Sequence, residues 1–278
     1  MTSQQPVDIH GKPYNRSLLV GVLLIGTFCT ILNQTLLTTA LPTLMKEFDI
    51  SASSVQWLTT GFLLVNGIMI PISAWLINKF SSKKLYITAM STFLIGTIIC
   101  FVAQDFGMLL TGRLVQAAGV GVSMPLLQTI MLSIFPPEKR GAAMGTTGIV
   151  IGLAPALGPT LSGWIIDSYT WRGLFGMVIP IVVLVLILAS FLMKNVIQLS
   201  NPSIDVLSVI LSTLGFGSLL YGFSSVGDKG WGSPQVYGFL IVGAIVLCLF
   251  TYRQLHLEQP FLELRVFKSK VFTVAAIL

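Results

Sequence analysis

Two polar side chains interrupt an apolar run in which they are energetically costly. The stretch LLTGRLVQAAGVGVSMPLL, residues 109–127, is typical of a membrane-spanning helix, yet it contains Arg113 and Gln116. An arginine on an isolated helix in hydrocarbon costs at least roughly 2.5–3.5 kcal/mol, and its guanidinium does not lose its proton in practice. The side chain either reaches back to the surface near Asp105 or turns into a helix bundle. We expect it to turn inward with Gln116, because residues three apart share a helix face. The candidate acceptors are Asn33, Gln34, backbone carbonyls of the fifth span and cavity water.

A second unusual pattern is the density of glycine and proline in the fifth apolar run. Residues 148–164 read GIVIGLAPALGPTLSGW. Proline removes a backbone donor and kinks a helix, whereas glycine lets a neighbouring backbone come close. Plain packing would explain small residues, but the two prolines favour a hinge or gate. The residues concerned are Gly148, Gly152, Pro155, Gly158, Pro159 and Gly163.

The composition indicates which kind of protein must position these residues. The chain is 54% hydrophobic and only 9% charged, whereas soluble domains carry about 25% charged residues. Helices of about 20 apolar residues are needed to span a bilayer, and no segment alternates like a barrel strand. The sequence therefore predicts an all-α polytopic membrane protein. We expect spans near 17–41, 55–77, 85–103, 107–132, 142–166, 173–193, 204–226 and 235–252, with a ninth beginning at about 271.

The distribution of basic residues predicts the orientation of these spans. If the N-terminus is cytoplasmic, twelve of the sixteen Lys and Arg residues lie inside, and only Lys46, Arg172 and Lys229 lie outside. This bias is the positive-inside rule, and it explains the net charge of +6 without nucleic acid. We therefore expect a multi-pass protein of the plasma membrane with a cytoplasmic N-terminus and no nucleic-acid partner.

Residues suited to enzymatic or metal chemistry are absent from the predicted spans. Both histidines, His10 and His256, lie outside them, and no HExxH or CxxC spacing occurs. Cys29, Cys100 and Cys248 fall inside apolar runs, where we expect small buried filler. The sequence predicts no catalytic residue, no metal site and no cofactor, and no filter-like loop indicates a channel.

Several motifs resemble those of one transporter family. The fifth-run array is similar to the antiporter motif of drug exporters in the major facilitator superfamily, with Ser162 at a usual glycine position. RLVQAAG resembles the superfamily's fourth-helix motif through Arg113, Gln116 and Gly119. ILNQTLLTTALP resembles the first-helix motif of the fourteen-helix drug:proton antiporter branch, with Asn33 where many members have aspartate.

Two further stretches strengthen the resemblance. AWLINKFSSKKL is similar to the loop between the second and third helices through Lys79 and Lys83, although Asn78 replaces the usual aspartate. The runs QWLTTGFLLVNGIMIPISAWLI and FPPEKRGAAMG look like those of lincomycin-resistance-type permeases within that branch.

The resemblance implies a domain organisation. Family members have two six-helix bundles, with two extra helices between them in this branch. Residues 1–195 would form the N-terminal six-helix bundle, 196–253 the two inserted helices, and 254–278 a cytoplasmic linker and the start of a ninth helix in the C-terminal bundle. The linker RQLHLEQPFLELRVFKSK, residues 253–270, fits either an amphipathic surface segment or a solvated connection.

The resemblance also implies a multidrug efflux permease that exports small amphiphilic drugs by alternating access, in exchange for protons. It would need no cofactor besides the proton gradient, and its partners would be the drugs and the lipid bilayer, with no obligate protein partner. Arg113 and Gln116 would act in proton coupling. The substrate cavity would include Asn33, Gln34, Asn66, Met124 and Gln128, for which interhelix packing is an equal alternative. A truncated, non-transporting membrane protein remains the alternative function.

Proton antiport needs a titrating group inside the membrane. All ten acids lie in loops or near span ends. Either Asp167 or Asp205 reaches inward, or the group lies in the second bundle, which this chain lacks. We favour the second interpretation.

Overall fold

The structure of the protein is a computed structural model that describes residues 6–200, 205–257, 260 and 262–277. Within these ranges the regular structure is helical, and one isolated antiparallel bridge joins Val7 to Pro13. The helices are α1 (Arg16–Phe48), α2 (Ala52–Lys79), α3 (Ser82–Phe101), α4 (Phe106–Ile134), α5 (Pro137–Ser168), α6 (Arg172–Leu192), α7 (Val206–Lys229), α8 (Pro234–His256), the short 3₁₀ helix η1 (Leu264–Lys268) and α9 (Lys270–Ile277).

The eight predicted spans are confirmed. Among the described residues, eight helices are long and apolar enough to cross a membrane. Most of them extend past the predicted ends, with α1 continuing to Phe48 and α8 to His256. Asn15 accepts from the Leu18 amide, Ser51 from the Ser54 amide and Asp105 from the Met108 amide, so each satisfies a first-turn donor.

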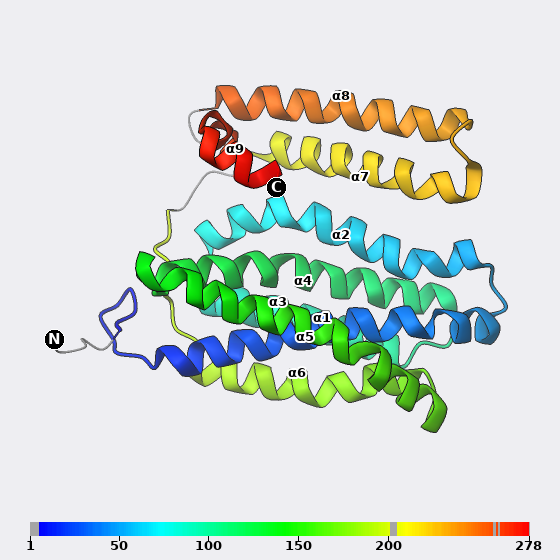
Figure 1. Cartoon of the computed structure of the whole chain (residues 1–278), viewed down its shortest axis with the longest axis horizontal. Coiled ribbons are helices and arrows are strands. Elements are labelled where there is room, and N and C mark those ends of the chain that lie inside the picture. Colours follow the sequence, from blue (N-terminus) through cyan, green and yellow to red (C-terminus); the bar gives the residue numbers. More distant parts are fainter. Residues whose placement is uncertain (1–5, 201–204, 258–259, 261, 278) are drawn as a thin grey trace.

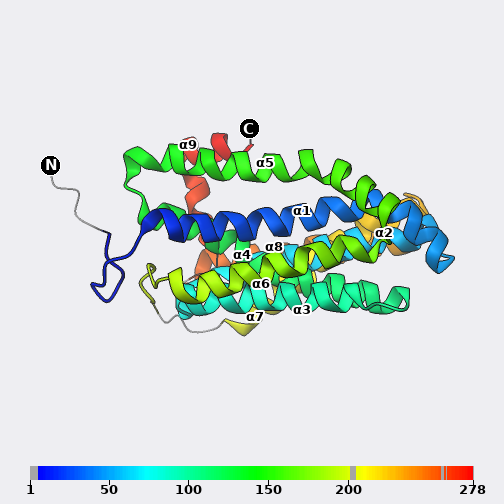
Figure 2. The ribbon, with the colours of Figure 1, turned by 90° about the horizontal axis from the view of Figure 1, so that it is seen from below.

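The helices form a six-helix unit with a hairpin at its side (Figure 1). Within the unit, α4 packs against α2 and α3, while α1 packs against α5 and α6. The hairpin of α7 and α8 joins the unit through contacts between α7 and α2. Seen from below, α5 and α3 lie on opposite faces of the unit, with α1 and α6 between them (Figure 2). The division into units at residues 195 and 253 stays a prediction, and α8 continues past the second boundary to His256.

Glycines on α3 and α4 allow these two helices to pack closely. A Cβ on Gly96 would lie 2.6 Å from the Gln116 nitrogen, and one on Gly119 would lie 2.5 Å from the Ala89 oxygen. These obstructing atoms belong to the backbone and cannot rotate away. The α3–α4 contact thus depends on residues without a side chain, as is common between membrane helices.

A polar cluster holds the α7–α8 hairpin together at the end that carries the N-terminus. Arg253 donates two hydrogen bonds of 3.0 Å to Asp205, and Gln254 donates to Ser208 at 2.5 Å. Burial opposes ionisation of Asp205, but the hydrogen bonds from Arg253 and Ser208 outweigh it and hold the carboxyl pKa below its ordinary value. Asp205 therefore serves as the N-cap of α7 and the partner of Arg253.

Hydrogen bonds tie the described part of residues 253–270 to the end of α8, and whether this segment lies on the membrane surface or in solvent stays a prediction. The Leu262 amide donates to the Gln254 side chain at 2.9 Å, and Arg265 donates to the Leu257 carbonyl at 2.6 Å. These bonds fold the described part of the segment back onto the end of α8, where η1 forms. The ninth helix begins at Lys270, close to the expected position.

One expectation about the cysteines is wrong. Cys29 and Cys100 are buried as expected, but Cys248 is exposed on α8. Only α7 among the described helices packs extensively against α8, so the opposite face of α8 remains uncovered in this chain.

The two ends of the unit differ in basic character, and this difference yields a test of orientation. Lys139 lies at the end that holds the N-terminus, and Lys229 lies at the other end; both side chains are exposed. With the native cysteines replaced by alanine, Lys139→Cys should react with an impermeant maleimide only in opened cells, and Lys229→Cys should react in intact cells. Reaction of both variants in intact cells would contradict a cytoplasmic N-terminus.

Candidate functional site

Arg113 lies inside the bundle, and the inward prediction is confirmed. Its side chain is 1% exposed, although α4 is a membrane-length helix. One guanidinium nitrogen donates to the Asn33 oxygen at 3.0 Å and to the Gln116 oxygen at 2.7 Å. Nε donates to the Leu58 carbonyl oxygen at 3.4 Å. Asn33 was an expected acceptor, whereas the carbonyl comes from α2 rather than from α5.

Two further residues fix the geometry of this Arg113 cluster. Phe62 on α2 presents its ring to the guanidinium, with 4.3 Å between the ring centroid and the Arg113 Cζ, which is a favourable cation–π distance. Thr97 on α3 accepts from the Gln116 amide nitrogen at 2.8 Å. That bond turns the Gln116 oxygen toward Arg113. Four helices, α1 to α4, therefore meet at one charged group.

The cluster carries a positive charge without a carboxylate partner. The ion pairs in the described part of the chain join Arg172 to Glu47, Arg253 to Asp205, and Arg265 to Glu263, and none includes Arg113. Asp167 is exposed in the last turn of α5. Neither Asp167 nor Asp205 is bonded to Arg113 in the described residues, so the less favoured alternative, in which one of them reaches inward, finds no support.

Asn33 also has an unused donor. Its Nδ2 is buried and has no hydrogen-bond partner among the described residues, while its oxygen is bonded to Arg113. A buried donor without a partner costs about 1–3 kcal/mol. The cluster can thus accept one more polar or anionic group, provided that the surrounding helices move to admit it.

The five predicted cavity residues differ in how far they are exposed. Asn33 is buried in the Arg113 cluster at 1% exposure. Gln34, Asn66 and Met124 are half-buried, and Gln128 is exposed on α4. A cavity of about 430 Å³ between α2 and α7 is lined by other residues, including Gln56, Trp57 and Phe223. A substrate cavity built from the five residues stays a prediction.

The glycine and proline array of α5 divides between two faces. A Cβ on Gly158 would lie 2.8 Å from the Thr35 Cβ of α1, whereas Cβ atoms on Gly148, Gly152 and Gly163 would meet nothing within 4 Å. Pro155 and Pro159 lie inside α5 and are exposed, and the helix bends past its midpoint (Figure 2). Of the four glycines in the array, Gly158 is therefore the one that packs against another helix in the described part of the chain.

Ser162 accounts for part of the same interface. Its hydroxyl donates to the Leu36 carbonyl oxygen of α1 at 2.9 Å. The departure from glycine at this position thus adds a hydrogen bond between α5 and α1.

The expected loop motif lies in helix ends instead of in a loop. α2 ends at Lys79 and α3 begins at Ser82, so only two residues separate the helices. Asn78 donates to the Ala74 carbonyl, Lys79 lies over the Trp75 ring, and Lys83 donates to the Ser190 carbonyl of α6. The motif therefore connects α3 to α6 at this end of the unit.

Sequence reasoning missed three members of the Arg113 cluster. Thr97 offered a signal, because it is the one hydroxyl in the apolar stretch 93–103. Phe62 and the Leu58 carbonyl offered none, since aromatic residues and backbone groups occur in every span.

Comparison with known proteins gives the relationships of the chain. Residues 23–264 match the family described as Major Facilitator Superfamily. The chain is 57% identical over 271 residues to the uncharacterized MFS-type transporter YcnB of Bacillus subtilis, covering 98% of this chain and 57% of YcnB. It is 45% identical over 263 residues to the lincomycin resistance protein LmrB of the same organism, covering 94% of this chain and 55% of LmrB.

A solved structure shares the fold. The peptide transporter POT in complex with sulfate (E310Q mutant) aligns with a TM-score of 0.64 at 14% identity, over 86% of this chain and 52% of that one. The chain thus spans about half the length of the relatives that it matches. With the family match over most of its length and eight membrane-length helices, the chain belongs to the major facilitator superfamily.

Proposed function

We propose that the protein containing this chain is a multidrug efflux permease that works by alternating access in exchange for protons. The observation that carries the proposal is the Arg113 cluster, a buried guanidinium with neutral partners at the meeting point of four helices. The relative named for lincomycin resistance supports a drug as the exported compound.

The proposed role of Arg113 is electrostatic. A permanent positive charge in a low-dielectric interior lowers the pKa of any carboxyl group that approaches it. A carboxylate would approach in one state of the cycle, lose its proton there, and regain it in another state, away from the guanidinium. In the described residues no carboxylate contacts Arg113, so we propose that the titrating group belongs to a second bundle.

Alternating access would follow from motion between two bundles around a midplane site. Gly148 and Gly152 on the exposed part of α5 leave open space beside them, and we propose that a helix of the second bundle packs there. Gln128 and the half-buried Gln34, Asn66 and Met124 would contact the drug only once a second bundle closes the cavity.

The proposal is tested by comparing the 278-residue chain with the complete reading frame that contains it. Cells expressing residues 1–278 should carry the protein in the membrane but export a fluorescent drug no faster than vector controls, because half of the cavity wall is missing. Cells expressing the complete frame should show saturable export. If the complete protein is made at normal levels and exports none of a panel of amphiphilic drugs, the proposal fails and the result supports a non-transporting membrane protein.

Asn33 should influence which drugs are exported. Asn33→Asp would place a carboxylate where the Asn33 oxygen now lies, 3.0 Å from the guanidinium nitrogen, and would cancel the net charge of the cluster. Two unit charges about 10 Å apart interact by roughly 1.5 kcal/mol at an effective dielectric of about 20. Export of cationic dyes should therefore rise by up to about tenfold relative to neutral drugs. Asn78→Asp, at the membrane surface, is the control, and an unchanged ratio for Asn33→Asp at equal expression would contradict the prediction.

A further inference from the structure

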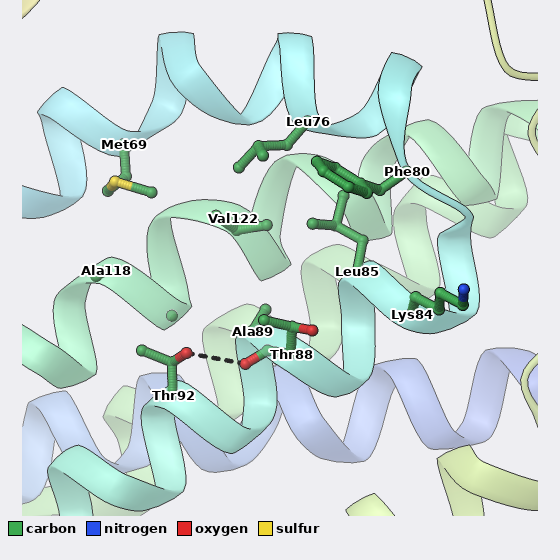
Figure 3. A pocket seen from close by; sticks show the side chains of 11 residues that line it. Met69, Leu76, Phe80, Lys84, Leu85, Thr88, Ala89, Thr92, Ala118 and Val122 are labelled. Carbon is green, nitrogen blue, oxygen red and sulfur yellow. Dashed lines mark hydrogen bonds between the residues drawn. The ribbon is translucent and has the colours of Figure 1, made fainter. Parts of the chain in front are cut away.

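A groove outside the Arg113 cluster has no part in the proposed transport cycle. It lies where α2 and α3 diverge over α4, near the end of the unit that carries the N-terminus, and its volume is about 270 Å³. Figure 3 shows its apolar walls, which include Met69 and Leu76 from α2 and Ala118 and Val122 from α4, with Lys84 at one end. The groove is open at the surface of α3, where Lys84 and Thr88 are exposed.

Lys84 differs from the other lysines near this end of α2 and α3. Lys79 lies over the Trp75 ring, 4.8 Å from its centroid, and Lys83 donates to the Ser190 carbonyl. Lys84 forms neither a hydrogen bond nor an ion pair with any residue that the structure describes. Its ammonium is therefore available to an anion at the mouth of the groove.

Two hydroxyl groups continue from Lys84 along the same side of α3. Thr88 and Thr92 follow at four-residue intervals, and each step advances about 6 Å along the helix. Thr92 donates to the Thr88 carbonyl at 2.9 Å, as drawn in Figure 3. The Thr88 hydroxyl has no partner among the described residues, so one donor remains free just inside the mouth.

We propose that this groove binds an anionic phospholipid. The phosphate would pair with Lys84, the Thr88 hydroxyl would donate to an ester oxygen below it, and one acyl chain would lie along Met69, Leu76, Ala118 and Val122. The order of these groups along the groove, from the lysine through the hydroxyl to the apolar walls, would then match the order of phosphate, ester and acyl chain in the lipid.

Size and position favour a lipid over a drug as the occupant. Pockets for drug-sized ligands enclose most of the ligand, whereas this groove of about 270 Å³ is open on one side and holds only part of a larger molecule, such as one acyl chain. Its basic end lies at the lysine-rich end of the unit. If that end is cytoplasmic, as predicted, it faces the leaflet that attracts basic residues through its anionic lipids.

The test is lipid binding by the purified, delipidated 278-residue chain, measured by native mass spectrometry. Dioleoylphosphatidylglycerol should bind at least about fivefold tighter than dioleoylphosphatidylcholine, since one lysine near an anionic headgroup contributes about that factor. Lys84→Gln should remove this preference, and it should weaken phosphatidylcholine binding much less, because the choline cation offsets the phosphate charge of that lipid. Lys139→Gln is the matched control, because Lys139 is also exposed at the same end but lies outside the groove.

Two further arms separate the headgroup from the acyl chain. Ala118→Leu fills the groove and should weaken binding of both lipids, while free glycerol phosphate should not compete for the site. The proposal is overturned if Lys84→Gln and Lys139→Gln reduce phosphatidylglycerol binding equally, or if glycerol phosphate alone displaces the lipid. If Ala118→Leu does not fold, the exposed Lys84→Gln variant still decides the result.

Discussion

Replacing Arg113 by alanine should reduce drug export by the complete protein to below about a tenth of its normal rate. The guanidinium contacts Asn33, Gln116 and the Leu58 carbonyl, and hydrogen bonds to a charged group contribute about 1.5–3 kcal/mol each. If the charge lowers the pKa of a titrating carboxyl group during transport, replacing Arg113 removes this proton coupling as well as the contacts. Export of a fluorescent drug from cells with matched amounts of protein in the membrane measures the effect.

Two further variants serve as comparisons for this result: Arg113→Lys retains the charge, and Arg140→Ala removes an exposed arginine. Lysine retains the charge but lacks the planar fork of donors, so it should restore only part of the export. Arg140 is exposed and donates to the Phe135 carbonyl, so its loss should leave export near normal. Normal export by Arg113→Ala would show that the cluster is only a packing element.

The Gly112→Ala variant should be markedly less stable than the unaltered chain. A Cβ at this position would lie 2.9 Å from the Gly96 oxygen and 2.9 Å from the Cys100 nitrogen. Both atoms belong to the α3 backbone, so the helices themselves must separate. Overpacking typically costs about 1–3 kcal/mol, and the thermal unfolding midpoint of the purified chain in detergent should fall accordingly.

Gly148→Ala is the matched control for this substitution. Gly148 also lies within a long helix, but a Cβ there meets nothing within 4 Å. Because alanine favours a helix by about 1 kcal/mol over glycine, this variant of the 278-residue chain should melt at the same temperature or higher. Equal melting of the two variants would contradict the proposed role of glycine in the α3–α4 contact.

The number and order of the helices could be predicted because long apolar runs are unambiguous. Their ends could not be, since the helices continue into polar sequence that hydropathy assigns to loops, as α1 does to Phe48 and α2 does from Ala52. The expected loop at Asn78 and Lys79 illustrates the difference, because both residues belong to the last turn of α2.

The direction of Arg113 could also be predicted, but most of its surroundings could not. Burial of an arginine requires acceptors, and Asn33 was among the candidates because it is one of few polar residues in the first span. The choice of a carbonyl from α2 depends on how closely that helix approaches α4. The glycines of α5 are a second example, because the sequence alone does not show which of them pack against another helix. Gly158 contacts α1, whereas Gly148 faces open space.

The most direct test of the proposed function is proton movement in proteoliposomes that contain the complete protein and a pH-sensitive dye. Adding an exported drug to vesicles with an imposed pH gradient should accelerate the dissipation of that gradient, and Arg113→Ala should remove the acceleration. Drug transport that proceeds without any change in the pH gradient would contradict the role assigned to the Arg113 cluster.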